Sequence, residues 1–213
     1  MSHRAARWPQ IAIDAGPVAA GPRSGIGQAT AGLLDALTDV WPTDWPAPIA
    51  WINSPRHPLP TGDRWLRSGL WRVVHTRWSG KMLLRGWQWL DRPKLERLVG
   101  AIDLVHSPSG VIPSVRAARR ILTVHDLYFR HRPEHTDTYG GRYFAATYPR
   151  RLPHVDACVC ISQFTRAELL RFYPVDPARL RVIHWGVDVS HFRPEPADGD
   201  GALLASLGVR RPY

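Results

Sequence analysis

Residues 155–194 read VDACVCISQFTRAELLRFYPVDPARLRVIHWGVDVSHFRP and carry the strongest fold signal in the chain. Residues 157–161 form an apolar run of the kind found in a strand that is buried on both faces of a sheet. Ser162 then precedes a segment with helical apolar spacing, which Pro174 ends. A second strand is expected at 181–184. The stretch therefore predicts a strand, a helix and a strand, the repeating unit of a parallel sheet.

Short apolar runs alternate with helical segments along the rest of the chain. This alternation predicts an α/β fold, a Rossmann-like three-layer domain with a mainly parallel sheet over residues 1–194. Residues 195–213 are expected to be an interdomain linker and the start of a second domain. Their first part, 195–202, is acidic and glycine-rich, and a short helix that ends at Gly208 is expected to follow. Strands are expected at 11–13, 49–52, 103–106 and 120–124. Helical segments are expected at 26–40, at 81–99, where Pro93 interrupts them, and at 137–152.

The composition is that of a globular protein, with 44% hydrophobic and 22% charged residues in 213. No apolar run approaches the roughly 20 residues that span a bilayer, and the basic N-terminus lacks a signal-peptide pattern, so a cytoplasmic protein is expected. A net charge of +10 favours anionic partners. Cys158 and Cys160 share one side of their strand, where we interpret them as small buried hydrophobes.

Residues 64–97 combine nine basic residues with five tryptophans. The simplest interpretation is that helices pack these indole rings into the domain while arginine stems cover the surface. Two alternatives remain open from the composition. An interfacial membrane helix also needs a basic, Trp-rich face, which would place the protein at the inner face of the membrane. Aromatic and basic side chains can also stack on nucleic acid, although we expect no nucleic-acid partner.

Polar and glycine residues gather where the predicted strands end, and ligands of open parallel sheets bind at that edge. Gly25 and Gly27 open the first helix, where backbone amides favour an anion or a sugar hydroxyl. Their alternative role is a flexible turn and cap, with Ser24 as the N-cap of the helix. The pattern is not a complete dinucleotide fingerprint, because Thr30 occupies the position of the last glycine, and no phosphate-binding lysine follows.

His125 and Asp126 follow the strand at 120–124, where a histidine can bind a hydroxyl or carry a proton near neutral pH. They are the predicted catalytic residues, with Asp126 orienting His125 or holding a substrate hydroxyl. A solvated turn is the alternative. His106, Ser162 and Gly186 end other strands and complete the predicted substrate-binding set, although helix capping also explains Ser162. We assign no metal, because Pro133 separates His131 from His135 and disfavours a helical pair.

The chain resembles the N-terminal, acceptor-side domain of a family 4 glycosyltransferase, which corresponds to one half of the two-domain GT-B fold. Five segments carry the resemblance in the family's order and rough spacing. They are Ser24-Gly25-Ile26-Gly27, Asp103-Leu104-Val105-His106-Ser107-Pro108, Thr123-Val124-His125-Asp126-Leu127, Cys160-Ile161-Ser162-Gln163-Phe164-Thr165 and Val182-Ile183-His184-Trp185-Gly186-Val187-Asp188. Trp185 departs from the asparagine that often precedes this glycine, and Gln28 stands where a basic residue is common.

The resemblance implies retaining transfer of a hexose from a nucleotide-sugar to an acceptor hydroxyl, in cell-surface polysaccharide or glycolipid synthesis and without a metal or other cofactor. It places His125 beside the transferred sugar, with Asp126 in support, and the glycine-opened helix at the interdomain cleft. The family's second domain carries most nucleotide contacts. A C-terminal domain in cis or in trans is therefore the expected partner, and this chain alone is expected to be inactive. The alternative is a non-catalytic module that binds sugar or a membrane surface.

Overall fold

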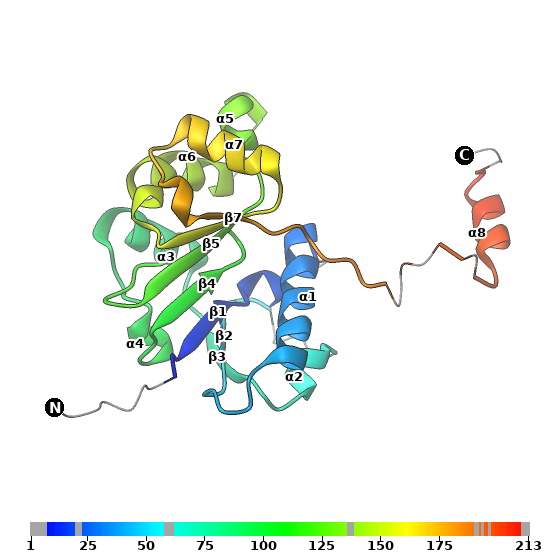
Figure 1. Ribbon diagram of the computed structural model, residues 1–213, viewed down its shortest axis with the longest axis horizontal. Coiled ribbons are helices and arrows are strands. Elements are labelled where there is room, and N and C mark those ends of the chain that lie inside the picture. Colours follow the sequence, from blue (N-terminus) through cyan, green and yellow to red (C-terminus); the bar gives the residue numbers. More distant parts are fainter. Residues whose placement is uncertain are drawn as a thin grey trace.

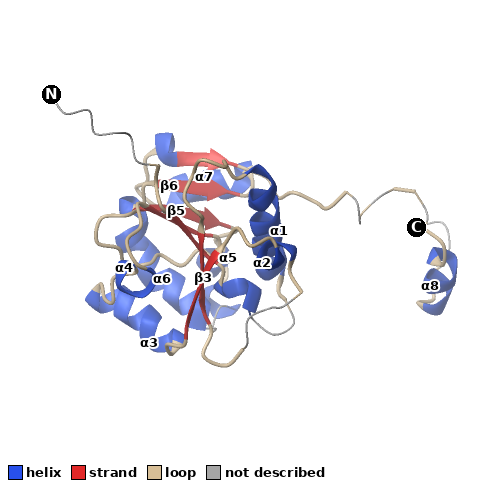
Figure 2. Cartoon of the chain, turned by 90° about the horizontal axis from the view of Figure 1, so that it is seen from below, coloured by secondary structure: helices blue, strands red, loops and turns tan. Residues whose placement is uncertain are grey.

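The computed structural model describes residues 8–209 apart from 20–22, 58–61, 136–138, 190–191, 193 and 196. A twisted sheet forms the centre of the molecule, and helices cover both of its faces (Figures 1 and 2). The sheet has seven strands in the order β3-β2-β1-β4-β5-β6-β7, and every neighbouring pair is parallel. This confirms the predicted Rossmann-like three-layer α/β domain. The strands are β1 (Ile11–Asp14), β2 (Ile49–Asn53), β3 (Arg72–Thr76), β4 (Leu104–Ser107), β5 (Arg119–Val124), β6 (Ala157–Cys160) and β7 (Leu180–Val182).

Helical segments connect most successive strands, but residues 108–118 join β4 to β5 without a helix. The helices expected at 26–40 and 137–152 agree with the structure to within two residues at each end, and β7 ends two residues earlier than expected. The α-helices are α1 (Gly25–Val40), α2 (Arg64–Arg67), α3 (Gly80–Arg85), α4 (Glu96–Val99), α5 (Tyr128–His131), α6 (Tyr139–Arg151), α7 (Gln163–Phe172) and α8 (Asp200–Ser206). The remaining helical segments are η1 (Gly16–Ala19), η2 (Gly86–Leu90), η3 (Pro133–His135), η4 (Leu152–His154) and η5 (Pro177–Arg179).

Alternate residues of the central strands enter different cores, because successive side chains of a strand point to opposite faces. Ile13 of β1 packs in a cluster with Leu34 of α1 and Trp65 of α2. Its neighbour Ala12 belongs to a second cluster, with Trp87 of η2 and residues of α4. The apolar strands of the sequence are thus buried on both faces, which is why they lack a polar alternation.

A third cluster fills the other half of the sheet, between β5, β6 and the helices α6 and α7. Both cysteines lie in it with free thiols. Burial raises the pKa of Cys158 to about 12 and that of Cys160 to about 11. The interpretation of these cysteines as buried hydrophobes is therefore confirmed.

The helical segment expected over 81–99, with its interruption at Pro93, is present as α3 and η2 over residues 80–90 and as α4 after the break. The strand β3 was missed, because its RVVHT sequence is basic and it is an edge strand with a single neighbour. Three of the five tryptophans are buried: Trp65, Trp71 and Trp87. Trp78 and Trp89 are exposed by 47% and 61%. Packing into the domain thus explains most, but not all, of this Trp-rich segment.

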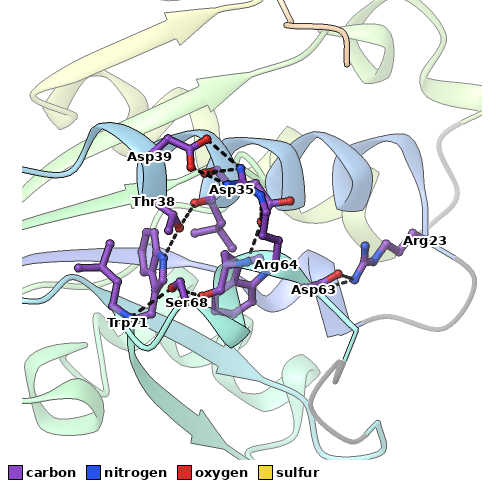
Figure 3. Close-up of polar contacts among 11 residues, drawn as sticks. Arg23, Asp35, Thr38, Asp39, Asp63, Arg64, Ser68 and Trp71 are labelled. Carbon is purple, nitrogen blue, oxygen red and sulfur yellow. Dashed lines mark hydrogen bonds and ion pairs between the residues drawn. The ribbon is translucent and has the colours of Figure 1, made fainter. Parts of the chain in front are cut away.

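Polar contacts join α1 to α2 and to the start of β3 (Figure 3). The guanidinium of Arg64 donates to both carboxylate oxygens of Asp39, at 2.5 and 2.9 Å. The indole nitrogen of Trp71 donates to Thr38 Oγ1 at 2.8 Å. The contacts with Arg64 are exposed, so we expect them to add less to stability than the contact of buried Trp71.

Helix α8 lies apart from the sheet in both views (Figures 1 and 2). None of its residues is buried, and it begins after Gly199, which has a positive φ of 95°. The division of the chain into residues 1–194 and 195–213 stays a prediction.

Candidate active site

The carboxyl edge of the sheet brings together side chains from strands that are far apart in sequence. The strand order reverses between β1 and β4, because β2 and β3 lie on one side of this pair and β5 to β7 on the other. In open parallel sheets such a topological switch point is where ligands bind. Asp14 ends β1, Ser107 ends β4, and His125 directly follows β5. All three lie at this edge.

The switch point holds a carboxylate and two serines. Ser109 donates to Asp14 Oδ2 at 3.1 Å, and Ser107 and Ser109 share a hydrogen bond of 3.2 Å. The Gly16 amide donates to Asp14 Oδ1 at 3.0 Å. Burial raises the pKa of Asp14, although these hydrogen bonds oppose the change. Sequence reasoning placed Asp14 and Ser109 at strand ends but did not include them in the predicted site.

The helix α1 begins at this edge with two glycines that differ in their surroundings. Ser24 is the N-cap and accepts a hydrogen bond from the Gly27 amide at 3.2 Å. A Cβ on Gly27 would lie 2.8 Å from the Pro17 carbonyl oxygen, so close packing against η1 requires glycine there. Gly25 is exposed, and a Cβ on it would meet nothing within 4 Å. The cap prediction is confirmed, and packing accounts for Gly27 but not for Gly25.

His125 is held by two contacts from other parts of the chain. Its Nε2 lies 2.7 Å from the carbonyl oxygen of Pro108. Because a carbonyl only accepts, Nε2 carries the proton. The imidazole stacks on Trp185, with ring centroids 5.3 Å apart and an interplanar angle of 25°. The His125 ring is therefore held by a hydrogen bond from Nε2 to the Pro108 carbonyl and by stacking on the Trp185 indole.

Asp126 and Ser162 have local structural partners. Asp126 is exposed, and its Oδ1 accepts from the Tyr128 amide at 2.9 Å, which forms the turn into α5. Ser162 is the N-cap of α7 and accepts from the Thr165 amide at 3.0 Å. Thr165 Oγ1 in turn donates to the His125 carbonyl at 3.0 Å. The cap of α7 thus fixes the backbone of the predicted catalytic histidine.

His106 lies within the sheet, where its Nε2 is 2.9 Å from Thr123 Oγ1 of the neighbouring strand. Burial lowers the pKa of His106 to about 4. The ring is therefore neutral at physiological pH, and its hydrogen bond joins β4 to β5. Its role as a substrate ligand stays a prediction.

Gly186 follows Trp185 at the end of the β7 segment and is exposed. A Cβ at Gly186 would meet nothing within 4 Å among the described residues. Like Gly25, it is a glycine that this domain's own packing does not require. The residues described also contain no group of three or more histidine, cysteine or acidic side chains that could hold a metal ion.

Comparisons with known proteins identify the family. The family model described as Glycosyltransferase Family 4 matches residues 49–191. The chain therefore belongs to the family 4 glycosyltransferases, and the resemblance seen in the sequence is confirmed, including the assignment to the N-terminal domain.

Two relatives are the alpha-maltose-1-phosphate synthases of Mycolicibacterium smegmatis and Mycobacterium tuberculosis (strain CDC 1551 / Oshkosh), 34% and 33% identical over 92 residues. Each match covers 42% of this chain and 24% of the relative. A glycosyltransferase from Rickettsia africae ESF-5 has a similar fold, with a TM-score of 0.51 and 15% identity. That similarity covers 96% of this chain and 50% of the other. The chain thus spans only part of the relatives that it matches.

The helices offer no candidate for a membrane span. Over the part of the chain that the structure describes, none of them is both long and apolar enough to cross a bilayer.

Proposed function

We propose that this chain is the acceptor-side half of a glycosyltransferase that moves a hexose from a nucleotide-sugar to an acceptor hydroxyl with retention at the anomeric carbon. Membership of the family supports glycosyl transfer in general. The observation that carries the finer proposal is His125, whose ring is fixed by Pro108 and Trp185 at the carboxyl edge of the sheet. A second domain, in cis or in trans, holds most of the donor nucleotide and completes the site.

The chemistry of the transfer explains why a fixed imidazole is useful at this edge. The bond between the anomeric carbon and the donor phosphate breaks as the acceptor oxygen bonds to that carbon, and the proton of the acceptor hydroxyl passes to the departing phosphate. The sugar gains positive charge and the departing phosphate gains negative charge. With Nε2–H donated to Pro108, the neutral form of the His125 ring presents Nδ1 as an acceptor for a sugar hydroxyl. In this proposal His125 positions the transferred sugar, and Trp185 keeps the imidazole from rotating.

The beginning of α1 is the proposed contact for the donor phosphate or its sugar. The first amides of a helix are unpaired within it, and its dipole favours negative charge there. Gly25 leaves these amides uncovered, because no side chain projects from that position. Asp14, at the end of β1, is proposed to accept a hydrogen bond from a hydroxyl of the acceptor substrate. Ser109 is proposed to donate one to such a hydroxyl.

The direct test is a transfer assay with the chain and a separately produced second domain of a family 4 relative. We expect turnover only in the mixture, and a loss of at least about 100-fold for His125→Ala. The assay should cover several nucleotide-sugars and report the anomeric configuration of the product by NMR. Inversion at the anomeric carbon would refute the retaining mechanism, and full activity of His125→Ala would refute the role of the imidazole.

A matched pair of glycine substitutions tests the contact at α1. Gly25→Ala and Gly32→Ala change the same helix, and neither new methyl group would meet an atom within 4 Å. Both should leave stability unchanged or raise it by up to about 1 kcal/mol. Only Gly25→Ala should raise the KM for the donor. If Gly25→Ala and Gly32→Ala had the same KM for the donor, the donor would not approach Gly25.

Peripheral membrane contact is a further part of the proposal, because a lipid-linked acceptor would be met at a bilayer surface. Met82, Trp89 and Leu90 are exposed by 71%, 61% and 72% on α3 and η2, beside exposed Lys81 and Arg85. Apolar and cationic side chains together suit an anionic lipid surface. Sedimentation with phosphatidylglycerol vesicles should exceed that with phosphatidylcholine vesicles, and Leu90→Ser should reduce it. Equal sedimentation with both vesicles would contradict this contact.

A further inference from the structure

The segment that follows β5, residues 125–131, is held by α7 at both of its ends. At its start, the Thr165 hydroxyl donates to the His125 carbonyl at 3.0 Å. At its end, His131 Nε2 hydrogen-bonds to Glu168 Oε2. Thr165 and Glu168 are three residues apart in α7 and therefore lie on the same face of that helix. One face of α7 thus holds both ends of the segment that carries the His125 imidazole.

Glu168 is an acidic residue inside the protein. Its side chain is only 9% exposed, and acidic residues are almost never buried without a partner. Besides His131, its partner is Arg171, whose guanidinium lies 3.5 Å from Oε1. Arg171 is 69% exposed, so solvent screens this ion pair and we expect it to contribute little. Among the described residues, the hydrogen bond with His131 is therefore the main compensation for burying the carboxylate.

The imidazole of His131 is held from a second side as well. It packs edge-on against the Phe172 ring, with centroids 5.4 Å apart and an interplanar angle of 77°. The guanidinium groups of Arg130 and Arg171 lie 5.1 and 5.2 Å from the centre of the same ring. These contacts order a side chain that is 40% exposed and would otherwise sample several rotamers. The end of α5 is thereby fixed against α7.

The residues between His125 and His131 form a stiff connection. Leu127 and Phe129 are buried in the third core cluster. Asp126 accepts a hydrogen bond from the Tyr128 amide at 2.9 Å and closes the turn into α5. A displacement of one end of this segment is therefore transmitted to the other end, because the middle is packed and hydrogen-bonded.

Stability alone does not explain a buried carboxylate at position 168. Replacing buried charged groups by apolar side chains of similar volume is often neutral or stabilising. A hydrogen bond between charged or polar groups does, however, fix a distance and a direction, which apolar packing does not. The contact between Glu168 and His131 is thus better suited to holding a geometry than to adding stability.

We propose that Glu168 and His131 are positioning residues, which fix the orientation of the His125 imidazole through α7 and the 125–131 segment. The inference rests on the proposed function, because it deepens the role of His125 there. His125 Nε2 must meet the Pro108 carbonyl at 2.7 Å for Nδ1 to face a sugar hydroxyl. A shift of this backbone by about 1 Å would break the alignment, and misplacements of that size can cost about 100-fold in rate.

The first test follows the His125 ring by NMR of the histidine side chains. The stacked Trp185 indole should displace the His125 ring-proton resonances, and Trp185→Leu measures how large that displacement is. Glu168→Leu keeps a similar volume without the carboxylate. It should reduce the displacement by at least about half, because the imidazole then samples orientations off the indole face. An unchanged displacement in folded Glu168→Leu would overturn the proposal.

Two controls separate positioning from a general loosening of the domain. His106 is the internal reference, because its ring hydrogen-bonds to Thr123 inside the sheet; its resonances should stay in place in Glu168→Leu. Glu134→Gln is the matched variant, since it removes a carboxylate charge three residues from His131 at an exposed ion pair with Arg132. It should leave the His125 resonances unchanged. Equal changes at His106 and His125, or an equal effect of Glu134→Gln, would overturn the proposal.

His131→Ala tests the same contact from its half-exposed side, where a substitution puts the fold at less risk. It should reduce the His125 displacement as Glu168→Leu does, and the double variant should be no worse than either single variant, because the two residues act as a pair. Glu168→Gln should retain most of the displacement, since its amide oxygen still accepts from His131. Additive effects in the double variant would contradict the pairing of these residues.

Transfer kinetics with a separately produced second domain give the functional readout. Glu168→Leu should lower kcat at least about tenfold and change the KM for the donor less than about threefold, since the imidazole is proposed to act on the transferred sugar rather than on donor binding. Wild-type kcat in Glu168→Leu would overturn the positioning role. Absence of transfer in the wild type would instead refute the proposed function, and the NMR result decides the orientation of His125 independently of it.

Discussion

His106 is expected to make the free energy of unfolding fall as the solution is acidified. In the unfolded chain the imidazole has an ordinary pKa of 6.5, and in the folded protein burial lowers its pKa to about 4. Between these values the unfolded state binds more protons, so stability is lost as the pH falls through this window. A difference of about 2.5 pH units corresponds to about 3 kcal/mol in the limit, and to about 2 kcal/mol between pH 7 and pH 5.

The measurement is urea unfolding followed by tryptophan fluorescence, for the wild type and for His106→Gln, from pH 8 to pH 5. The glutamine amide can still reach Thr123 but does not titrate in this range. At pH 8 the difference between the two proteins reports packing alone, because His106 is neutral in both states. Other titrating groups contribute equally to both proteins, so subtraction isolates His106.

Wild-type stability should fall by about 2 kcal/mol more than that of His106→Gln between pH 7 and pH 5. Parallel curves for the two proteins would refute the argument, since they would mean that the folded protein binds the proton as readily as the unfolded chain. If the free energy of unfolding of the wild type rose relative to that of His106→Gln as the pH falls, the predicted direction of the pKa shift would be wrong.

Three further predictions concern the carboxyl edge and the α1–α2 contact. Gly27→Ala should lower the free energy of unfolding by about 1–3 kcal/mol, because its methyl group would meet a carbonyl oxygen at 2.8 Å; a stable variant by urea unfolding would contradict this packing. Asp14→Asn should be at least as stable as the wild type at pH 7, since burial disfavours the carboxylate, and it should be less active in transfer; a less stable variant would refute the desolvation argument. Trp71→Phe should lower the free energy of unfolding by about 1 kcal/mol, because the hydrogen bond to Thr38 is lost. The thermal midpoints of Trp71→Phe, Thr38→Val and the double variant measure this effect, and additive effects of the two substitutions would show that the bond contributes nothing.

Local signals predicted most of the secondary structure. Ser24 and Ser162 both cap helices, as expected from their positions before apolar periodic segments. The failures lie where local signals conflict. Basic and aromatic residues hid the edge strand β3, which was not predicted. An edge strand needs less apolar surface than a central one, so its pattern is weaker.

The roles of the predicted site residues stay predictions, but their positions can be compared with the structure. The strand-end rule expected His125 at the carboxyl edge, and it lies there because parallel strands share one carboxyl end. It also selected His106, whose ring faces Thr123 inside the sheet. A residue at a strand end points either into the crevice or into the sheet, and its position in the sequence does not distinguish these directions.

The amino-acid sequence by itself determined the α/β class, the alternation of strands and helices and the caps, because these depend on residues within one or two turns of each other. Only the tertiary structure decided which distant groups meet. Ser109 contacts Asp14 across 95 residues, Trp185 stacks on His125, and Arg151 donates to the Trp87 carbonyl across 64 residues. The order of the strands determines these contacts. That order depends on how whole helices are buried against both faces of the sheet, and local periodicity in the sequence does not encode it.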